Sequence, residues 1–271
     1  MTPARHFIAC LPICAITATM LLAAAPVPTV VRATPTFADL ATLGLAAPIV
    51  VRATIYKTER LSARDAPSIP AGLARILVSA ATSAAIVAPC EIPPRLTYLT
   101  DITLDAHGKP PKLIGSDLLL FLRPGTAPGQ YALIASRGEV AWSAVADATL
   151  RSVLTAARDG KVPVVTGVTS AFRVPGAVPG EAESQFFLAT NDGKPVSLVV
   201  LTRPGQPRRV SIALGDVIDD AAPPIAKNTL LWYRLACSLP PQLPPALDAG
   251  TEVAGDYRFI LADLGPCKRT V

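Results

Sequence analysis

Proline placement limits the length of every element that this chain can form. The sequence has 28 prolines in 271 residues, about twice the average usage. Proline lacks a backbone N–H and interrupts helices and central strands. We therefore expect short strands and helices separated by proline-rich loops. Adjacent prolines mark five of these loops, at Pro93-Pro94, Pro110-Pro111, Pro223-Pro224, Pro240-Pro241 and Pro244-Pro245.

The first 33 residues have the organisation of an export signal. Arg5 precedes an apolar run over 7–22, and small residues follow at 23–25 and at Ala33. We expect 1–33 to be a signal peptide, cleaved at a point between about residues 23 and 33. A retained anchor is the alternative, but about 16 residues with an internal proline fall short of the roughly 20 that span a bilayer.

Such a signal predicts a periplasmic or secreted protein of a Gram-negative-type cell. Cleavage after Ala33 removes two of the 25 cations and no acid, which leaves 23 cations against 20 anions, a net charge of +3. That charge is too small to favour nucleic acid or anionic lipid as a partner. No later stretch is long and apolar enough to span a membrane, so we expect no stable membrane insertion after cleavage.

Residues 34–145 read as a domain of short strands. β-branched and apolar runs alternate with turn signals such as those at 106–110 and 124–129. Five or six strands at this spacing suggest a small closed barrel, because closure removes open sheet edges. The runs are Ile49–Tyr56, Arg75–Val87, Arg95–Leu104, Asp117–Arg123, Tyr131–Ala135 and Val140–Trp142.

Three segments of this region resemble a known type of barrel. Residues 48–53 (PIVVRA), 118–125 (LLLFLRPG) and 130–134 (QYALI) are similar to the small OB or netrin-like barrels of exported bacterial proteins. The resemblance implies a fold and attaches no function. Netrin-like protease inhibitors use an amino-terminal cysteine to reach a metal, and this chain has none there. The whole chain also resembles a group of uncharacterised exported proteins of Gram-negative bacteria.

A helix and linker over 146–162 separate the barrel from a second domain at 163–271. Apolar residues recur with helical spacing before Arg158, and Asp159-Gly160 ends the pattern. Three strands follow at 184–190, 195–203 and 208–214, joined by turn-forming tetrapeptides.

Two helices are expected after these strands, at 225–238 and 251–264. The second domain is therefore predicted as a three-stranded antiparallel meander with two C-terminal helices on its apolar face. Together with the barrel it makes the chain a β-rich α+β protein.

Three cysteines remain after the expected signal peptide: Cys90, Cys237 and Cys267. In an oxidising compartment we predict a Cys237–Cys267 disulfide, because each residue follows a helix-like segment. Closing a loop of about 30 residues would contribute roughly 3–4 kcal/mol. Cys90 is then the spare thiol, and we interpret it as a half-buried loop residue with no adjacent cysteine or histidine to activate it.

Histidine usage excludes several classes of site. The expected mature chain has one histidine, His107, in a Gly-Pro turn that favours exposure. A multi-histidine metal centre within one chain is excluded, a serine triad would have to use His107, and phosphate-binding glycine motifs are absent. We therefore predict no cofactor and no metal.

Acid pairs are the remaining candidates for chemistry. Glu181 and Glu183 precede the first meander strand, and Asp216, Asp219 and Asp220 follow the third. Ordinary loop chemistry explains these acids better than catalysis does. Our leading hypothesis is a non-catalytic periplasmic module that binds a protein or an envelope component. The alternative is a carboxylate-dependent hydrolase, with Glu183 and Asp216 as the first suspects.

Fractionation of cells that express the native gene tests the export prediction. We expect a periplasmic or secreted form that begins between about residues 24 and 34, with Cys237 and Cys267 oxidised. Mass spectrometry of the intact protein, with and without thiol alkylation, measures both. An uncut chain with both thiols reduced in the cytosol would contradict the prediction.

Overall fold

The computed structural model describes residues 34–215, 224–247 and 250–270, so the expected signal peptide lies outside the described part. Within these ranges no helix is long and apolar enough to cross a membrane. The elements in chain order are α1 (Phe37–Ala46), β1 (Ile49–Arg60), β2 (Leu73–Val87), β3 (Arg95–Thr103), β4 (Asp117–Pro124), β5 (Gln130–Leu133), β6 (Glu139–Ala141), α2 (Ala144–Arg158), β7 (Val165–Pro175), β8 (Ala182–Thr190), β9 (Val196–Thr202), β10 (Arg209–Leu214), α3 (Leu230–Ala236), a 3₁₀ turn (Pro245–Leu247) and α4 (Thr251–Leu264).

The first domain contains the predicted closed barrel. Its strands follow the order β1-β2-β3-β5-β4, and β4 pairs with β1 to close the ring. β3 and β5 run parallel, whereas the other neighbours in the ring are antiparallel. The short strand β6 pairs with β4 alongside β5. A barrel of five strands, with a sixth at its side, therefore confirms the expected closure.

Side-chain alternation on β1 and β4 divides the barrel interior from a second apolar layer. Val51 and Leu120 belong to the interior cluster. Val50 and Phe121 point the other way, into a cluster that α1 and α2 cover. Because β4 is buried on both faces, its sequence is an almost unbroken apolar run rather than an alternating one.

Helix α1 was not foreseen, since the predicted barrel domain began directly after the signal peptide. Thr36 caps this helix by accepting a hydrogen bond from the Asp39 N–H, and the Asp39 carboxylate accepts one in return from the Thr36 N–H. This reciprocal arrangement is the capping box that begins many helices. Thr36 followed three residues later by Asp39 was the sequence signal that could have indicated it.

The second domain has a four-stranded antiparallel sheet of order β10-β9-β8-β7, not the predicted three-stranded meander. The missed strand, β7, is mostly exposed and pairs with β8 through two irregularities in register. These irregularities break the alternation by which a strand is recognised. The predicted helix at 225–238 is also shorter, because Thr229 caps it and α3 begins at Leu230.

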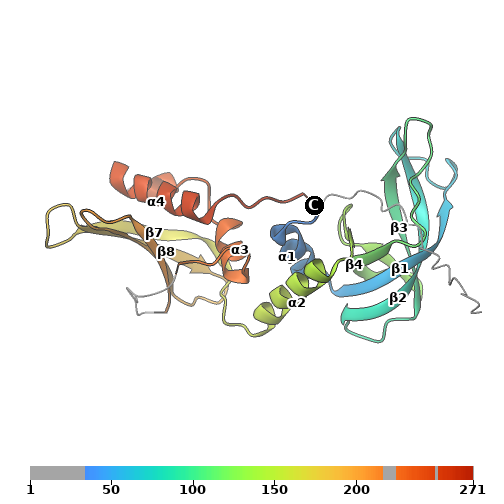
Figure 1. The fold of residues 1–271 in the computed structure, drawn as a ribbon, viewed down its shortest axis with the longest axis horizontal. Coiled ribbons are helices and arrows are strands. Elements are labelled where there is room, and N and C mark those ends of the chain that lie inside the picture. Colours follow the sequence, from blue (N-terminus) through green and yellow to red (C-terminus); the bar gives the residue numbers. More distant parts are fainter. Residues whose placement is uncertain (1–33, 216–223, 248–249, 271) are drawn as a thin grey trace, which may run out of the picture.

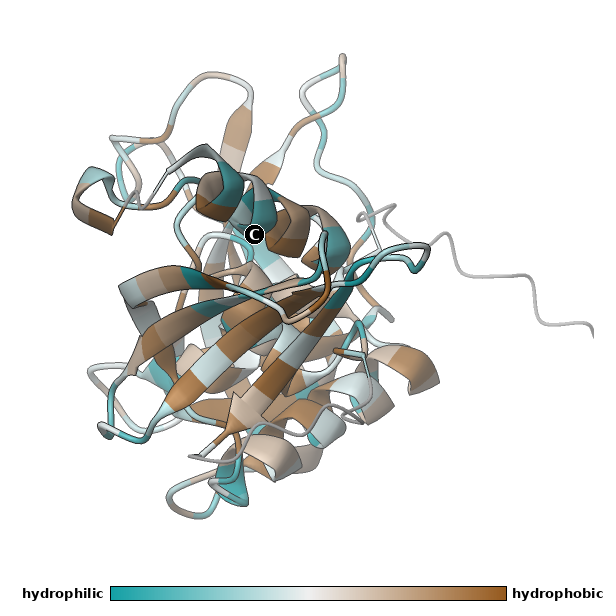
Figure 2. Ribbon diagram, turned by 90° about the vertical axis from the view of Figure 1, so that its left-hand side faces the viewer, coloured by the Kyte–Doolittle hydropathy of each residue, from teal (hydrophilic) through white to brown (hydrophobic). Residues whose placement is uncertain are grey.

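Helix α4 lies along one face of this sheet, which Figure 1 shows at the end of the molecule away from the barrel, and α3 lies at the end of the sheet nearer to α1. Apolar residues recur along the strands beneath α4 (Figure 2). They form one core with Trp232 of α3 and with Tyr257 and Ile260 of α4. Cys237 and Cys267 lie at disulfide distance, with their sulfur atoms 2.08 Å apart, which agrees with the predicted pair.

Three helices join the two domains. Ala41 of α1, Val153 of α2 and Leu230 of α3 are buried together. The Phe37 ring meets the edge of Trp232, with centroids 5.9 Å apart, and the hydroxyls of Thr42 and Tyr233 lie 3.0 Å apart. The domain boundary predicted near residue 160 lies in the connection between α2 and β7. The helix before this connection, α2, packs against α1 and α3.

The substitution Gly44→Ala tests the contact between α1 and α2, and Gly255→Ala in α4 serves as its control. A Cβ at Gly44 would lie 2.5 Å from Cδ1 of Leu150, which is fully buried. Gly44→Ala should lower the free energy of unfolding by about 1 kcal/mol. The added methyl group overpacks the contact at a cost of about 1–3 kcal/mol, and the higher helix propensity of alanine over glycine offsets about 1 kcal/mol of this cost. Gly255→Ala in α4 meets nothing closer than Arg258 Nη2 at 3.9 Å and should gain about 0.5–1 kcal/mol. Urea denaturation measures both, and a stabilised Gly44→Ala protein would contradict the packing.

Candidate functional site

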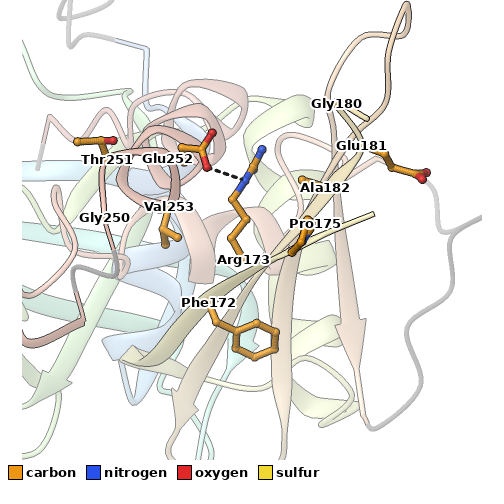
Figure 3. Close-up of a pocket in the computed structure, with 10 residues that line it drawn as sticks. All are labelled: Phe172, Arg173, Pro175, Gly180, Glu181, Ala182, Gly250, Thr251, Glu252 and Val253. Atoms are coloured by element: carbon orange, nitrogen blue, oxygen red, sulfur yellow. Dashed lines mark ion pairs between the residues drawn. The ribbon is translucent and has the colours of Figure 1, made fainter. Parts of the chain in front are cut away.

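An open pocket of about 700 Å³ lies at the far end of the second domain. The β7–β8 hairpin, residues 172–182, forms one wall, and residues 250–253 at the start of α4 form the other (Figure 3). β7 is an edge strand of its sheet. The pocket therefore lies beside the edge of the sheet, where the hairpin meets the first turn of α4.

Strand alternation gives the pocket an apolar side and a charged side. Phe172 points to the face of the sheet away from α4, where its ring lies 5.8 Å from that of Phe187. Arg173 points to the opposite face, toward α4, and is paired in register with Ser184 of β8. Figure 3 shows the guanidinium of Arg173 directed at Glu252 and the ring of Phe172 directed away from it.

Asp256 anchors the charged side. Its side chain is nearly inaccessible, and its carboxylate accepts hydrogen bonds from Ser184 Oγ at 2.6 Å and from Arg208 Nη1 at 3.0 Å. Arg173 Nη1 donates to the same carboxylate. A buried carboxylate is costly unless it is paired and hydrogen-bonded. Asp256 therefore fixes both arginines against the end of the sheet.

The remaining charges at the pocket are paired as well. Arg173 Nε lies 3.4 Å from Glu252, one helical turn before Asp256, and Arg203 Nε lies 3.3 Å from Glu181. Arg208 also lies over the ring of Phe259, with its guanidinium carbon 4.9 Å from the centroid. The hairpin thus carries paired charges on the face of β7 toward α4 and the exposed ring of Phe172 on the other face. Such a wall suits recognition better than proton transfer.

The structure describes only the glutamates among the predicted acids. Glu181 lines the pocket, whereas Glu183 lies two residues further along β8 and accepts a hydrogen bond from Gln185 Nε2 at 2.5 Å. Asp216, Asp219 and Asp220 lie outside the described residues. The pairing of Glu183 with Asp216 therefore stays a prediction.

His107 lies in the exposed turn that the sequence indicated. The Asp105 carboxylate caps this turn by accepting the His107 N–H at 2.9 Å. Among the described residues, no group of three or more His, Cys, Asp or Glu side chains is arranged to hold a metal ion.

Cys90 is exposed, so the expectation of a half-buried residue was wrong. It lines a smaller pocket of about 320 Å³ on the barrel, together with Tyr131 and the connection over 124–129. Burial, with a smaller contribution from the neighbouring Cys90, raises the pKa of Tyr131.

Sequence reasoning missed Arg173, Ser184, Arg208 and Asp256. These residues lie far apart in the chain, and strand β7, which carries Arg173, was not predicted. One signal was present in α4, where Asp256 falls beside the apolar positions Val253 and Tyr257. A carboxylate within an apolar helical stripe indicates a buried partner.

Comparisons with known proteins supply no relative for this site. No family model matches the chain, and no curated protein matches it. The geometry of the pocket therefore carries the functional argument.

Substitutions at two acids of α4 test whether Asp256 organises the pocket. Asp256→Ala leaves Arg173 and Arg208 without their shared partner, so we expect a loss of about 2–4 kcal/mol in unfolding free energy. Glu252→Ala removes a carboxylate whose side chain is 77% exposed, and the expected loss is at most about 1 kcal/mol. Urea denaturation followed by circular dichroism measures both. Equal losses of unfolding free energy for the two variants would show that Asp256 does not organise the pocket.

Proposed function

We propose that this protein is a non-catalytic binding module of the cell envelope, and that the pocket between the β7–β8 hairpin and α4 contacts its partner. The observation that carries this proposal is the pairing of Arg173 with Asp256 and Glu252 on one face of the edge strand β7, with the exposed ring of Phe172 on its other face. Binding sites commonly combine apolar surface with a few polar groups held in place. The arginine pairs supply the fixed groups, and the hairpin supplies the apolar surface.

Exposed apolar side chains around the hairpin favour a macromolecular partner. Phe172, Val174 and Val178 are all exposed on this hairpin, and they continue the pocket onto the outer surface. Aromatic residues and arginine are the residue types that contribute most to protein interfaces. We therefore favour a protein or an envelope component with an apolar group over a small polar metabolite.

The fold and the disulfide support the rest of the proposal. The ring order β1-β2-β3-β5-β4 with a parallel β3–β5 pair supports assigning the barrel to the OB or netrin-like type. The bond between Cys237 and Cys267 is typical of proteins that fold in an oxidising compartment. Both observations favour an exported protein of the periplasm or the cell exterior.

Site-specific photo-crosslinking tests the proposed contact. A benzophenone amino acid replaces Phe172 in the pocket or, as a matched control, Leu99 on the barrel; the two residues are 40% and 44% exposed. The mature protein is irradiated in envelope extract of the producing cell. We expect a discrete adduct from position 172 that excess unlabelled protein suppresses, and none from position 99. No adduct from position 172, or the same adducts from both, would overturn the proposal.

A further inference from the structure

The last described residues leave α4 and return to the first helix of the chain. Residues 265–270, which we call the C-terminal strap, contain no helix or strand and end beside α1 (Figure 1). The Thr36 hydroxyl, which caps α1, donates to the Lys268 carbonyl oxygen at 2.8 Å. The two ends of the described chain therefore meet at the start of α1.

Asp39 is the main attachment point of the strap. The residue is 0% exposed, and its carboxylate accepts the Thr270 N–H at 2.6 Å and the Thr270 hydroxyl at 2.8 Å. The same carboxylate closes the capping box of α1 through the Thr36 N–H. Arg137, in the connection before β6, donates to the Thr270 carbonyl oxygen. The strap thus contacts both α1 and the barrel.

The strap itself buries little. Pro266, Lys268, Arg269 and Thr270 are exposed, and the strap contributes no buried apolar side chain to either core. A segment held by polar contacts at its end opens more easily than the cores on which it lies. The strength of its attachment therefore depends on polar contacts, of which Asp39 accepts two from Thr270.

The Cys237–Cys267 disulfide limits how far the strap can move. Cys237 is the C-terminal cap of α3, and α3 packs against α1 through Leu230 and Ala41. Cys267 lies only three positions before Thr270, so the bond holds Thr270 close to Asp39. A short tether of this kind raises the effective concentration of Thr270 at its site.

Three cations lie near the contact between Thr270 and Asp39. Arg137 from the barrel donates to the Thr270 carbonyl oxygen, and Lys268 and Arg269 precede Thr270 in the strap. Arg269 lies over Tyr233 of α3, 5.7 Å from the ring centroid. Arginine and lysine keep their charge throughout the acidic range. Burial opposes ionisation of Asp39, but the hydrogen bonds from Thr270 and Thr36 outweigh it and lower its pKa.

We propose that the C-terminal strap is a clasp between the two domains, closed by the ionised Asp39 carboxylate and tethered by the disulfide, that opens in acid before either core unfolds. Opening frees the start of α1 and leaves the domains joined by the helix contacts alone. The clasp is independent of the pocket proposed above as the binding site.

The direction of the pH dependence follows from linkage. The closed clasp binds the ionised carboxylate, so the pKa of Asp39 is lower when the clasp is closed than when it is open. The carboxylate therefore stabilises the closed form fully above the ordinary aspartate pKa of about 4, and this contribution is lost as the pH falls through the lower pKa of the closed form. The clasp is expected to be closed at neutral pH.

Trypsin cleavage of the strap at neutral pH measures how often the clasp opens, because Lys268 and Arg269 are its targets there. Thr270→Val removes one hydrogen bond to a charged acceptor, and this should raise the cleavage rate after these residues roughly tenfold. Thr270→Ser keeps the hydroxyl and should be cleaved at the wild-type rate. Asp39→Asn should be cleaved faster than either. Intact-mass spectrometry of the mature, disulfide-bonded protein gives the rates, and equal rates for Thr270→Val and Thr270→Ser would overturn the proposal.

An NMR titration tests the response to acid. We expect the Thr270 amide of the wild-type protein to move toward its unfolded position below about pH 4, while the amides of β8 and β9 keep their folded positions. In Thr270→Val the change should begin at higher pH. A Thr270 amide that moves only together with the core amides would also overturn the proposal.

Discussion

Helix α1 lies where the apolar layers of the two domains meet, and the arrangement of the rest of the molecule depends on its packing. Leu40 and Leu43 face the outer layer of the barrel, Ala41 meets α2 and α3, and Phe37 contacts Trp232 in the core of the second domain. A helix of ten residues is marginal alone in water, so tertiary packing stabilises it. Because α1 contributes to both domains, the contact between them does not rely on the linker after α2.

Buried carboxylates hold both ends of the second domain. At the end away from the barrel, Asp256 binds Arg173 and Arg208 and sets the shape of the proposed binding pocket. At the end beside α1, Asp39 binds Thr270 and attaches the C-terminal strap. A carboxylate removed from water binds geometrically fixed donors strongly, because the alternative is an unpaired buried charge. One type of interaction thus organises the pocket and the junction between the domains.

Within the barrel a third carboxylate has a comparable role. Glu139 of β6 is buried and accepts hydrogen bonds from Tyr98 at 2.8 Å and from Thr100 at 2.7 Å, both on β3. β6 pairs with β4 through its backbone, so this side chain links it to a strand further around the barrel. Thr97 and Tyr98 pair with β5, and the contact to Glu139 extends the closure beyond that short parallel pair.

The sequence by itself determined the local elements with strong periodicity or turn chemistry. The barrel strands, the β8–β9–β10 meander, α2, α4 and the cysteine pair were predictable, because alternation, helical spacing and Gly or Pro turns act over a few neighbouring residues. It gave less warning of α1 and β7, since a short helix and a bulged edge strand have weak local patterns. Only the tertiary structure decided that Arg173, Ser184, Arg208 and Asp256 share a site and that Thr270 returns to Asp39. These contacts join residues up to 231 positions apart, and no local pattern of residues specifies which distant side chain satisfies a buried charge.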